Sequence, residues 1–114
     1  MSKNEKKLDQ MLMDVGLREA QSGTEYVRQA VKMYQPRMSL TKELYPAIAQ
    51  AANSTPGGVE RAMRHAIESA FDRSRYDTVY AFFGNSIDPN SGKVTNGEFI
   101  ARMARIYREG LDEN

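Results

Sequence analysis

The sequence has no cysteine among its 114 residues, so disulfide bridges, thiolate zinc sites and cysteine nucleophiles are excluded. Nowhere does an apolar run reach the roughly 18 residues that a membrane-spanning helix needs. Residues 1–7 are not followed by the apolar stretch of an export signal. We therefore expect a cytoplasmic protein that does not associate with a membrane.

Net charge is also small, because 16 Lys and Arg oppose 15 Asp and Glu and leave +1. A surface that binds nucleic acid would have to come from the local placement of charge rather than from its sum. The hydrophobic share of 40% and the charged share of 27% are typical of a globular chain. This length suits one domain with its own core, and we expect a single domain over residues 1–114.

No stretch alternates β-branched residues in the manner of a strand, whereas six stretches carry apolar residues at helical spacing. The predicted class is all-α, with helices near residues 2–15, 22–34, 44–52, 56–73, 75–83 and 95–110. Capping boxes are expected to pair Ser2 with Glu5, Ser22 with Glu25 and Thr95 with Glu98. Thr55 and Ser74 are predicted as single caps, and the fifth helix is expected to turn Tyr76, Val79, Tyr80 and Phe83 inward.

The third and fourth helices are separated by very few residues, which predicts a helix-turn-helix over about residues 44–73. Ile48 and Ala52 are expected to face the core, and Ala49 is small where the helices cross. Asn53 suits the turn because asparagine tolerates a left-handed backbone.

On the fourth helix, Val59 and Ala62 are expected to anchor the inner side, which leaves charged residues on the outer side: Glu60, Arg61, Arg64, His65 and Glu68. Arginine can donate two hydrogen bonds to guanine, glutamate can accept one from cytosine, and histidine can hold a base or a phosphate. Equally, Glu60 and Arg64 stand four residues apart, as in a solvated helix pair contributing roughly 0.2–0.5 kcal/mol. From spacing alone, both interpretations stand.

Two segments carry a family resemblance: Leu44-Tyr45-Pro46-x-Ile48-Ala49 and Val59-Glu60-Arg61-Ala62-x-Arg64-His65-Ala66-Ile67-Glu68. They resemble the effector domain of the sporulation stage-zero master response regulator family. The resemblance continues through Phe83-Gly84 and through Thr95-Asn96-x-Glu98-Phe99-Ile100-Ala101. It covers roughly residues 40–107 and is weaker in the first two helices.

The resemblance implies a six-helix domain that binds short promoter boxes in double-stranded DNA and activates or represses transcription at entry into endospore formation. Such a bacterial protein would be associated with the nucleoid, monomeric in isolation and a tandem homodimer on DNA. Carried over by position, Glu60 and Arg61 would contact bases, Arg64 and His65 would contact bases or backbone, and Thr55 and Gly58 would complete the DNA-binding surface. A contact with the sigma subunit of RNA polymerase would fall around Thr78, Tyr80 and Phe83.

Two features depart from the family pattern. Relatives carry serine and arginine immediately before the valine, whereas this chain has Gly57 and Gly58, which removes one cationic contact and loosens the first helical turn. The family's phosphorylated receiver domain is expected to be absent, because the helical domain takes up all 114 residues.

Residues 88–99 carry Asp, Asn, Gly and Glu-Phe in the order of a calcium-binding EF-hand loop. The register fails, because counting back from Glu98 as the twelfth position places Asp88 at the second and Pro89 at the third. A turn followed by a capping box explains the same residues, and we expect no metal ion.

Catalysis and a cofactor are not expected, because the sole histidine, His65, has no partner on a recognisable catalytic motif. The main alternative to DNA binding is a protein-interaction module, in which exposed Tyr80, Phe82 or Phe83 would dock a partner helix. The last helix also repeats arginine every third residue, for phosphate, for a neighbouring protomer or simply as a solvated face: Arg102, Arg105 and Arg108.

Overall fold

The computed structural model describes residues 3–74 and 76–112, and within those ranges the chain forms six α-helices and no strand. They are α1 (Lys3–Val15), α2 (Ser22–Met33), α3 (Tyr45–Ala52), α4 (Pro56–Arg73), α5 (Tyr76–Phe83) and α6 (Asn96–Asp112). A π-helical turn, η1 (Leu40–Leu44), leads into α3, and a 3-10 turn, η2 (Gly84–Ser86), follows α5. The predicted all-α class with six helices is confirmed. None of the described helices is both long enough and apolar enough to cross a membrane.

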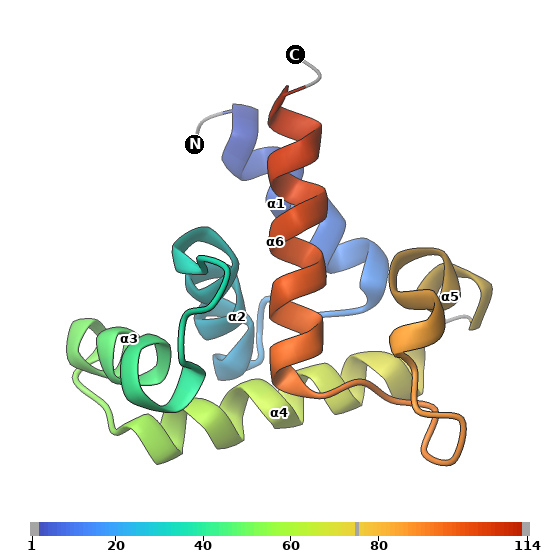
Figure 1. The fold of residues 1–114 in the computed structure, drawn as a ribbon. Helices are drawn as coiled ribbons and strands as arrows, with labels where there is room; N and C mark the ends of the chain where they lie inside the picture. The colour runs from blue at the N-terminus through green and yellow to red at the C-terminus, as the bar shows by residue number, and fades with distance from the viewer. Residues whose placement is uncertain (1–2, 75, 113–114) are drawn as a thin grey trace.

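The longest helix, α4, lies across the base of the molecule as drawn in Figure 1, and the other helices stand above it. Helices α2, α3 and α6 all pack against α4, with α6 rising from its middle and α3 beside its N-terminal part. Helix α5 lies near the C-terminal end of α4, and α1 runs beside α6 toward the far end of the molecule. This arrangement holds α4 from one side and leaves its lower side uncovered by the described helices.

The core is built from the apolar stripes that the helical spacing predicted. Its largest fully buried side chains come from α1, η1, α4 and α6: Leu8, Leu12, Leu44, Met63, Ile67, Phe99, Ile100 and Met103. Burying a side chain of this size stabilises the fold by about 1.5–3 kcal/mol. The core therefore joins the helices of both ends of the chain into one unit.

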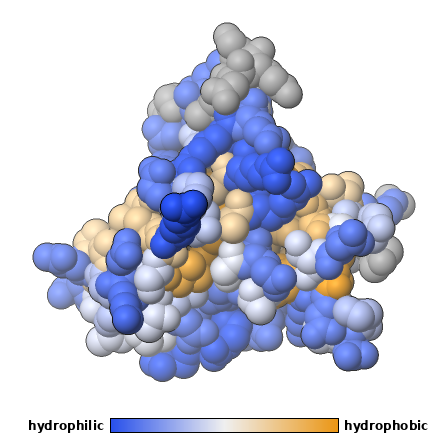
Figure 2. All heavy atoms as spheres, in the orientation of Figure 1, coloured by the Kyte–Doolittle hydropathy of each residue, from blue (hydrophilic) through white to orange (hydrophobic). Residues whose placement is uncertain are grey.

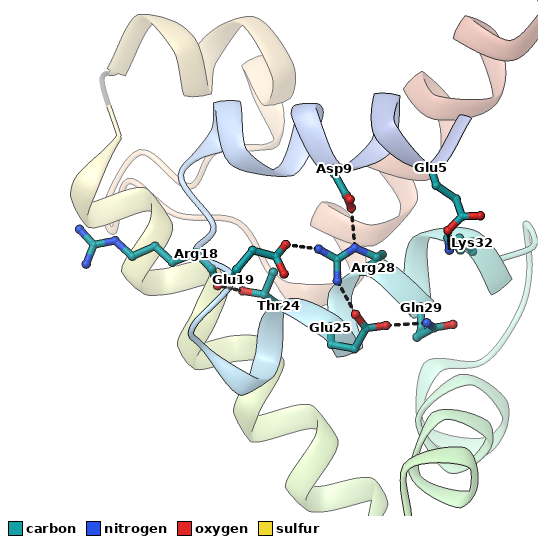
Figure 3. Close-up of polar contacts among 9 residues, drawn as sticks. All are labelled: Glu5, Asp9, Arg18, Glu19, Thr24, Glu25, Arg28, Gln29 and Lys32. Carbon is teal, nitrogen blue, oxygen red and sulfur yellow. Dashed lines mark hydrogen bonds and ion pairs between the residues drawn. The ribbon is translucent and has the colours of Figure 1, made fainter. Parts of the chain in front are cut away.

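An arginine at the centre of a carboxylate cluster ties α1 to α2 (Figure 3). Arg28 Nε lies 2.6 Å from Asp9 Oδ1, and the same guanidinium pairs with Glu19 and Glu25. Burial lowers the pKa of Arg28, but the hydrogen bond to Asp9 and the three negative charges outweigh it, so the net pKa is raised. The cluster thus holds one well-covered cation between two helices.

Helix α3 begins in the manner that Pro46 requires. Proline has no N–H, and its ring crowds the carbonyl four residues earlier. Just before Pro46 the backbone forms the wider π-helical turn η1. In this turn the N–H groups of Leu44 and Tyr45 donate to the carbonyls five residues earlier, those of Ser39 and Leu40. Ser39 caps the turn by accepting from the N–H of Lys42 at 3.1 Å. Pro46 then sits in the first turn of α3.

The capping box predicted for Ser22 and Glu25 is wrong. The residue at the N-cap of α2 is Gln21, one residue before Ser22, and Glu25 pairs with Arg28 and Gln29 instead of forming a capping box. At α2, neighbours on the same helix take the Glu25 side chain that the capping box would use. Ser74 ends α4 and donates its hydroxyl to the carbonyl of Val15. Its predicted cap of α5 depends on residue 75, which lies outside the described part of the chain.

Three further expectations differ from the structure. Helix α6 continues through Gly110 to Asp112, and the Gly110 carbonyl accepts from Lys7 Nζ at 3.0 Å. Ala52 is exposed rather than core-facing, while Ile48 and Ala49 are buried as expected. Tyr80 was expected to face inward, but it is 50% exposed. The capping box of Ser2 and the inward-facing side chain of Tyr76 lie outside the described part of the chain.

Candidate nucleic-acid interface

The turn between α3 and α4 has three residues and the geometry that its sequence predicts. Asn53 adopts a left-handed backbone with φ 55° and ψ 48°, and its N–H donates to the carbonyl of Ala49. Thr55 is extended at the start of α4, where its hydroxyl oxygen accepts from the N–H of Gly58 at 3.0 Å. Pro56 takes the first helical position, where no intrahelical donor is needed. The predicted cap at Thr55 is therefore confirmed, and it fixes where α4 begins.

The inner face of α4 is buried along its whole length through Val59, Met63, Ala66, Ile67 and Ala70. The closest approach is made by α2, because a Cβ added at Gly23 would lie 2.0 Å from the Ala62 carbonyl oxygen. Only glycine leaves room for α2 at that point. The position of α4 relative to α2 is thus set by this backbone contact on its inner face.

The outer face of α4 carries the predicted charged residues. Arg61, Arg64 and His65 are exposed, whereas Glu60 and Glu68 are half-buried. Figure 2, in the orientation of Figure 1, shows mainly hydrophilic surface along the lower edge, where α4 runs. The packing therefore aims cationic side chains away from the domain, as the sequence predicts.

Two of these residues are already paired. Arg64 Nη1 contacts Glu60 Oε1, with side-chain exposures of 50% and 30%. An exposed pair of this kind contributes less than about 1 kcal/mol. The pair therefore positions both side chains without preventing either from turning to a ligand.

Arg61 lies close to the start of its own helix. A Cβ added at Gly57 would stand 3.3 Å from Arg61 Nη1, so the guanidinium extends back over the first turn. The second glycine, Gly58, supplies the N–H that Thr55 accepts. The N-terminal turn thus places Thr55, Gly57, Gly58 and Arg61 at one end of the outer face.

A contact that sequence reasoning missed lies beside this face. The Nδ2 atom of Asn96, the first residue of α6, donates to Tyr45 Oη and to the Glu60 backbone oxygen, each at 3.2 Å. Burial raises the pKa of Tyr45, and the hydrogen bond from Asn96 opposes that shift. No local spacing reveals a contact between residues so far apart in the chain. A glycine inside a helix, such as Gly23, is by contrast a sequence sign of close backbone approach.

The residues expected to contact a sigma subunit are divided between surface and core. Thr78 is half-buried and Tyr80 exposed, but Phe83 is only 3% exposed. Its ring lies 5.0 Å from that of Phe99 and 5.5 Å from that of Phe71, centroid to centroid. Direct partner contact by Phe83 is therefore excluded in this conformation, because the ring completes the core between α4, α5 and α6.

The arginines of α6 are engaged within the domain. Arg102 Nε donates to the Phe82 carbonyl at 2.8 Å, and Arg108 donates to the Tyr34 carbonyl. Arg105 pairs with Glu109 at 2.9 Å on the surface. Two of the three thus stabilise the fold instead of forming a free cationic stripe.

The loop before α6 folds as a turn and a capping box. The Asp88 carboxylate accepts from the N–H of Asn90 at 2.8 Å, and Thr95 and Glu98 exchange backbone-to-side-chain hydrogen bonds at 3.1 Å. Among the described residues, no three His, Asp or Glu side chains gather in a way that could hold a metal ion.

The chain also matches a known protein family. Residues 8–106 match the family model described as the sporulation initiation factor Spo0A C terminal, a DNA-binding regulatory domain rather than a catalytic one. The match covers the whole of α2, α3, α4 and α5, which include both helices of the helix-turn-helix, and parts of α1 and α6. The chain therefore belongs to the family of Spo0A C-terminal domains, which bind DNA and regulate transcription in sporulation.

Proposed function

We propose that α4 enters the major groove of a promoter box and reads its sequence. The observation that carries this proposal is the exposure of Arg61, Arg64 and His65 on the side of α4 that faces away from α2, α3 and α6. The B-DNA major groove is about 12 Å wide and accepts one α-helix. With its inner face anchored, α4 can present only this side.

Each outer residue has a role that suits its chemistry. Arg61 donates to guanine O6 and N7, and Glu60 accepts from cytosine N4. Arg64 and His65 hold a second base or a phosphate. At the start of the helix, Thr55 and Gly58 lie beside the sugar-phosphate backbone, where the missing side chains at Gly57 and Gly58 permit close approach.

The same proposal extends to partners on the promoter. Two copies bind in tandem on neighbouring boxes of the bacterial nucleoid, and the surface of α5 at Thr78 and Tyr80 contacts the sigma subunit of RNA polymerase. Tyr80 supports this role because a half-exposed aromatic ring is a common anchor in protein interfaces. The buried ring of Phe83 packs beneath that surface.

The test is selection followed by titration. The purified chain is used to enrich a duplex from a randomised pool, and its affinity is then measured by fluorescence anisotropy for that duplex and for a scrambled duplex of the same composition. We expect the enriched duplex to bind at least about tenfold more tightly, which one or two well-read base pairs provide. If no sequence is enriched and neither duplex binds, the chain is a protein-interaction module whose Tyr80 surface would be its docking site.

A further inference from the structure

One side-chain amide joins the three helices that build the helix-turn-helix and its support. Asn96 begins α6, Tyr45 begins α3, and Glu60 lies in the second turn of α4. The Nδ2 atom of Asn96 is 3.2 Å from Tyr45 Oη and 3.2 Å from the Glu60 carbonyl oxygen. Both protons of the amide are therefore directed at partners, and each partner lies on a different helix.

The Glu60 carbonyl is an unusual place for such a contact. In an α-helix this oxygen accepts the N–H of the residue four positions later, which here is Arg64. The bond from Asn96 adds a second donor to the same oxygen. The turn held in this way contains Glu60, Arg61 and Arg64, the residues that the proposed function assigns to base contacts.

The surroundings of the Asn96 contact indicate that it sets the position of α4 rather than the folding of the domain. Tyr45 is 7% exposed, and Asn96 and Glu60 are half-buried, beside a groove between α4 and the loop before α6. Without Asn96, the Glu60 carbonyl keeps its intrahelical bond. Loss of the amide thus removes a tether from α4 and leaves the core side chains of α4 and α6 untouched.

Base recognition is sensitive to such a tether. A two-bond contact between arginine and guanine requires the helix to be held within about 0.5 Å of its productive position. Phosphate contacts by flexible lysine and arginine side chains tolerate larger shifts. A loosened α4 would therefore lose discrimination between sequences before it loses general affinity for DNA.

We infer that Asn96 is a positioning residue for sequence recognition, which fixes the base-contacting turn of α4 to α6 and α3 through the Glu60 carbonyl. This inference rests on the proposed function of α4. It assigns to the start of α6 a part in specificity although Asn96 itself touches no base.

The experiment compares Asn96→Ala and Asn96→Asp with the wild type on the enriched and scrambled duplexes. Aspartate keeps the size of the side chain and an acceptor for the Tyr45 hydroxyl, but it has no proton to donate to the Glu60 carbonyl. Asn90→Ala, at an exposed asparagine in the loop before α6, is the matched control. Circular dichroism and thermal unfolding establish that each variant is folded.

We expect both Asn96 variants to bind the enriched duplex about threefold to tenfold more weakly, because both lose the hydrogen bond to the Glu60 carbonyl. For Asn96→Ala, affinity for the scrambled duplex and its salt dependence stay at wild-type values, because no phosphate-binding cation is removed. If the ratio of the two affinities is unchanged in both variants, Asn96 serves the fold alone and the inference is wrong. If the wild type itself does not discriminate, the proposed function is wrong and the inference with it.

Discussion

The guanidinium of Arg61 lies against the backbone of Gly57, where an added Cβ would be 3.3 Å from Nη1. The atom that approaches is the far end of a flexible side chain, so a small rotation of Arg61 relieves the contact. The same cannot be said of Gly58, whose added Cβ would lie 3.0 Å from Oγ1 of the capping Thr55. Two adjacent glycines in the first turn of α4 therefore have different tolerances.

The substitution Gly57→Ala is expected to stabilise the domain by up to about 1 kcal/mol, because alanine loses less backbone entropy than glycine in a helix. Gly58→Ala should gain less, since its methyl group crowds the cap. Urea unfolding of both variants measures the difference. A loss of stability in Gly57→Ala would show that Arg61 cannot move aside.

The cap at Thr55 is expected to contribute measurably to stability. Removing the hydroxyl in Thr55→Ala leaves the Gly58 N–H without its partner, and the free energy of unfolding should fall by about 0.5–2 kcal/mol. Thr55→Ser keeps the acceptor and should remain within about 0.5 kcal/mol of the wild type. Equal stability of all three proteins in urea would rule out this role for the cap.

Gly23 is expected to be the least replaceable glycine of the described helices. In Gly23→Ala the new methyl group meets the Ala62 carbonyl, which belongs to helix backbone and cannot rotate away. Separation of α2 from α4 should cost about 1–3 kcal/mol. Gly97→Ala is the control, because its added Cβ would make only an ordinary contact, 3.5 Å from Leu40. Thermal unfolding that ranks the two variants alike would contradict this packing.

The positions of the helices could be predicted from sequence because apolar spacing reports which side of a helix is buried. The stripes at Leu8, Val59, Ile67 and Phe99 are all buried, and the cap at Thr55 is present. The capping box of Ser22 and Glu25 failed because Glu25 pairs with Arg28 and Gln29 of its own helix. The contact of Ser74 with Val15, 59 residues away in the chain, could not be predicted from local spacing.

The outer face of α4 could be predicted for the same reason, since residues opposite a buried stripe are exposed. The contacts that hold that face in place could not be predicted from the sequence. The closeness of Gly23 to Ala62, and of Asn96 to Glu60, depends on how helices distant in sequence cross. Local periodicity carries no information on such crossings, and it also placed the ring of Tyr80 on the wrong side of α5.

Tyr45 is expected to make stability depend on alkaline pH. Its folded-state pKa is raised above the ordinary value of 10.0, chiefly by burial. As pH rises past 10.0 the unfolded chain loses the proton first, so the free energy of unfolding falls until the folded pKa is passed. The decline should be smaller in Tyr45→Phe, measured by urea unfolding at several alkaline pH values.

Base reading by the outer face of α4 can be measured with Arg61→Ala on a panel of single-base-pair variants of the enriched duplex. Arg105→Ala, which removes an exposed arginine from α6, controls for net charge. We predict that Arg61→Ala weakens binding to the enriched duplex by about 1–3 kcal/mol and abolishes preference at one base pair, whereas Arg105→Ala keeps every preference. Unchanged affinity and unchanged preference in Arg61→Ala would show that this face of α4 does not read bases through Arg61.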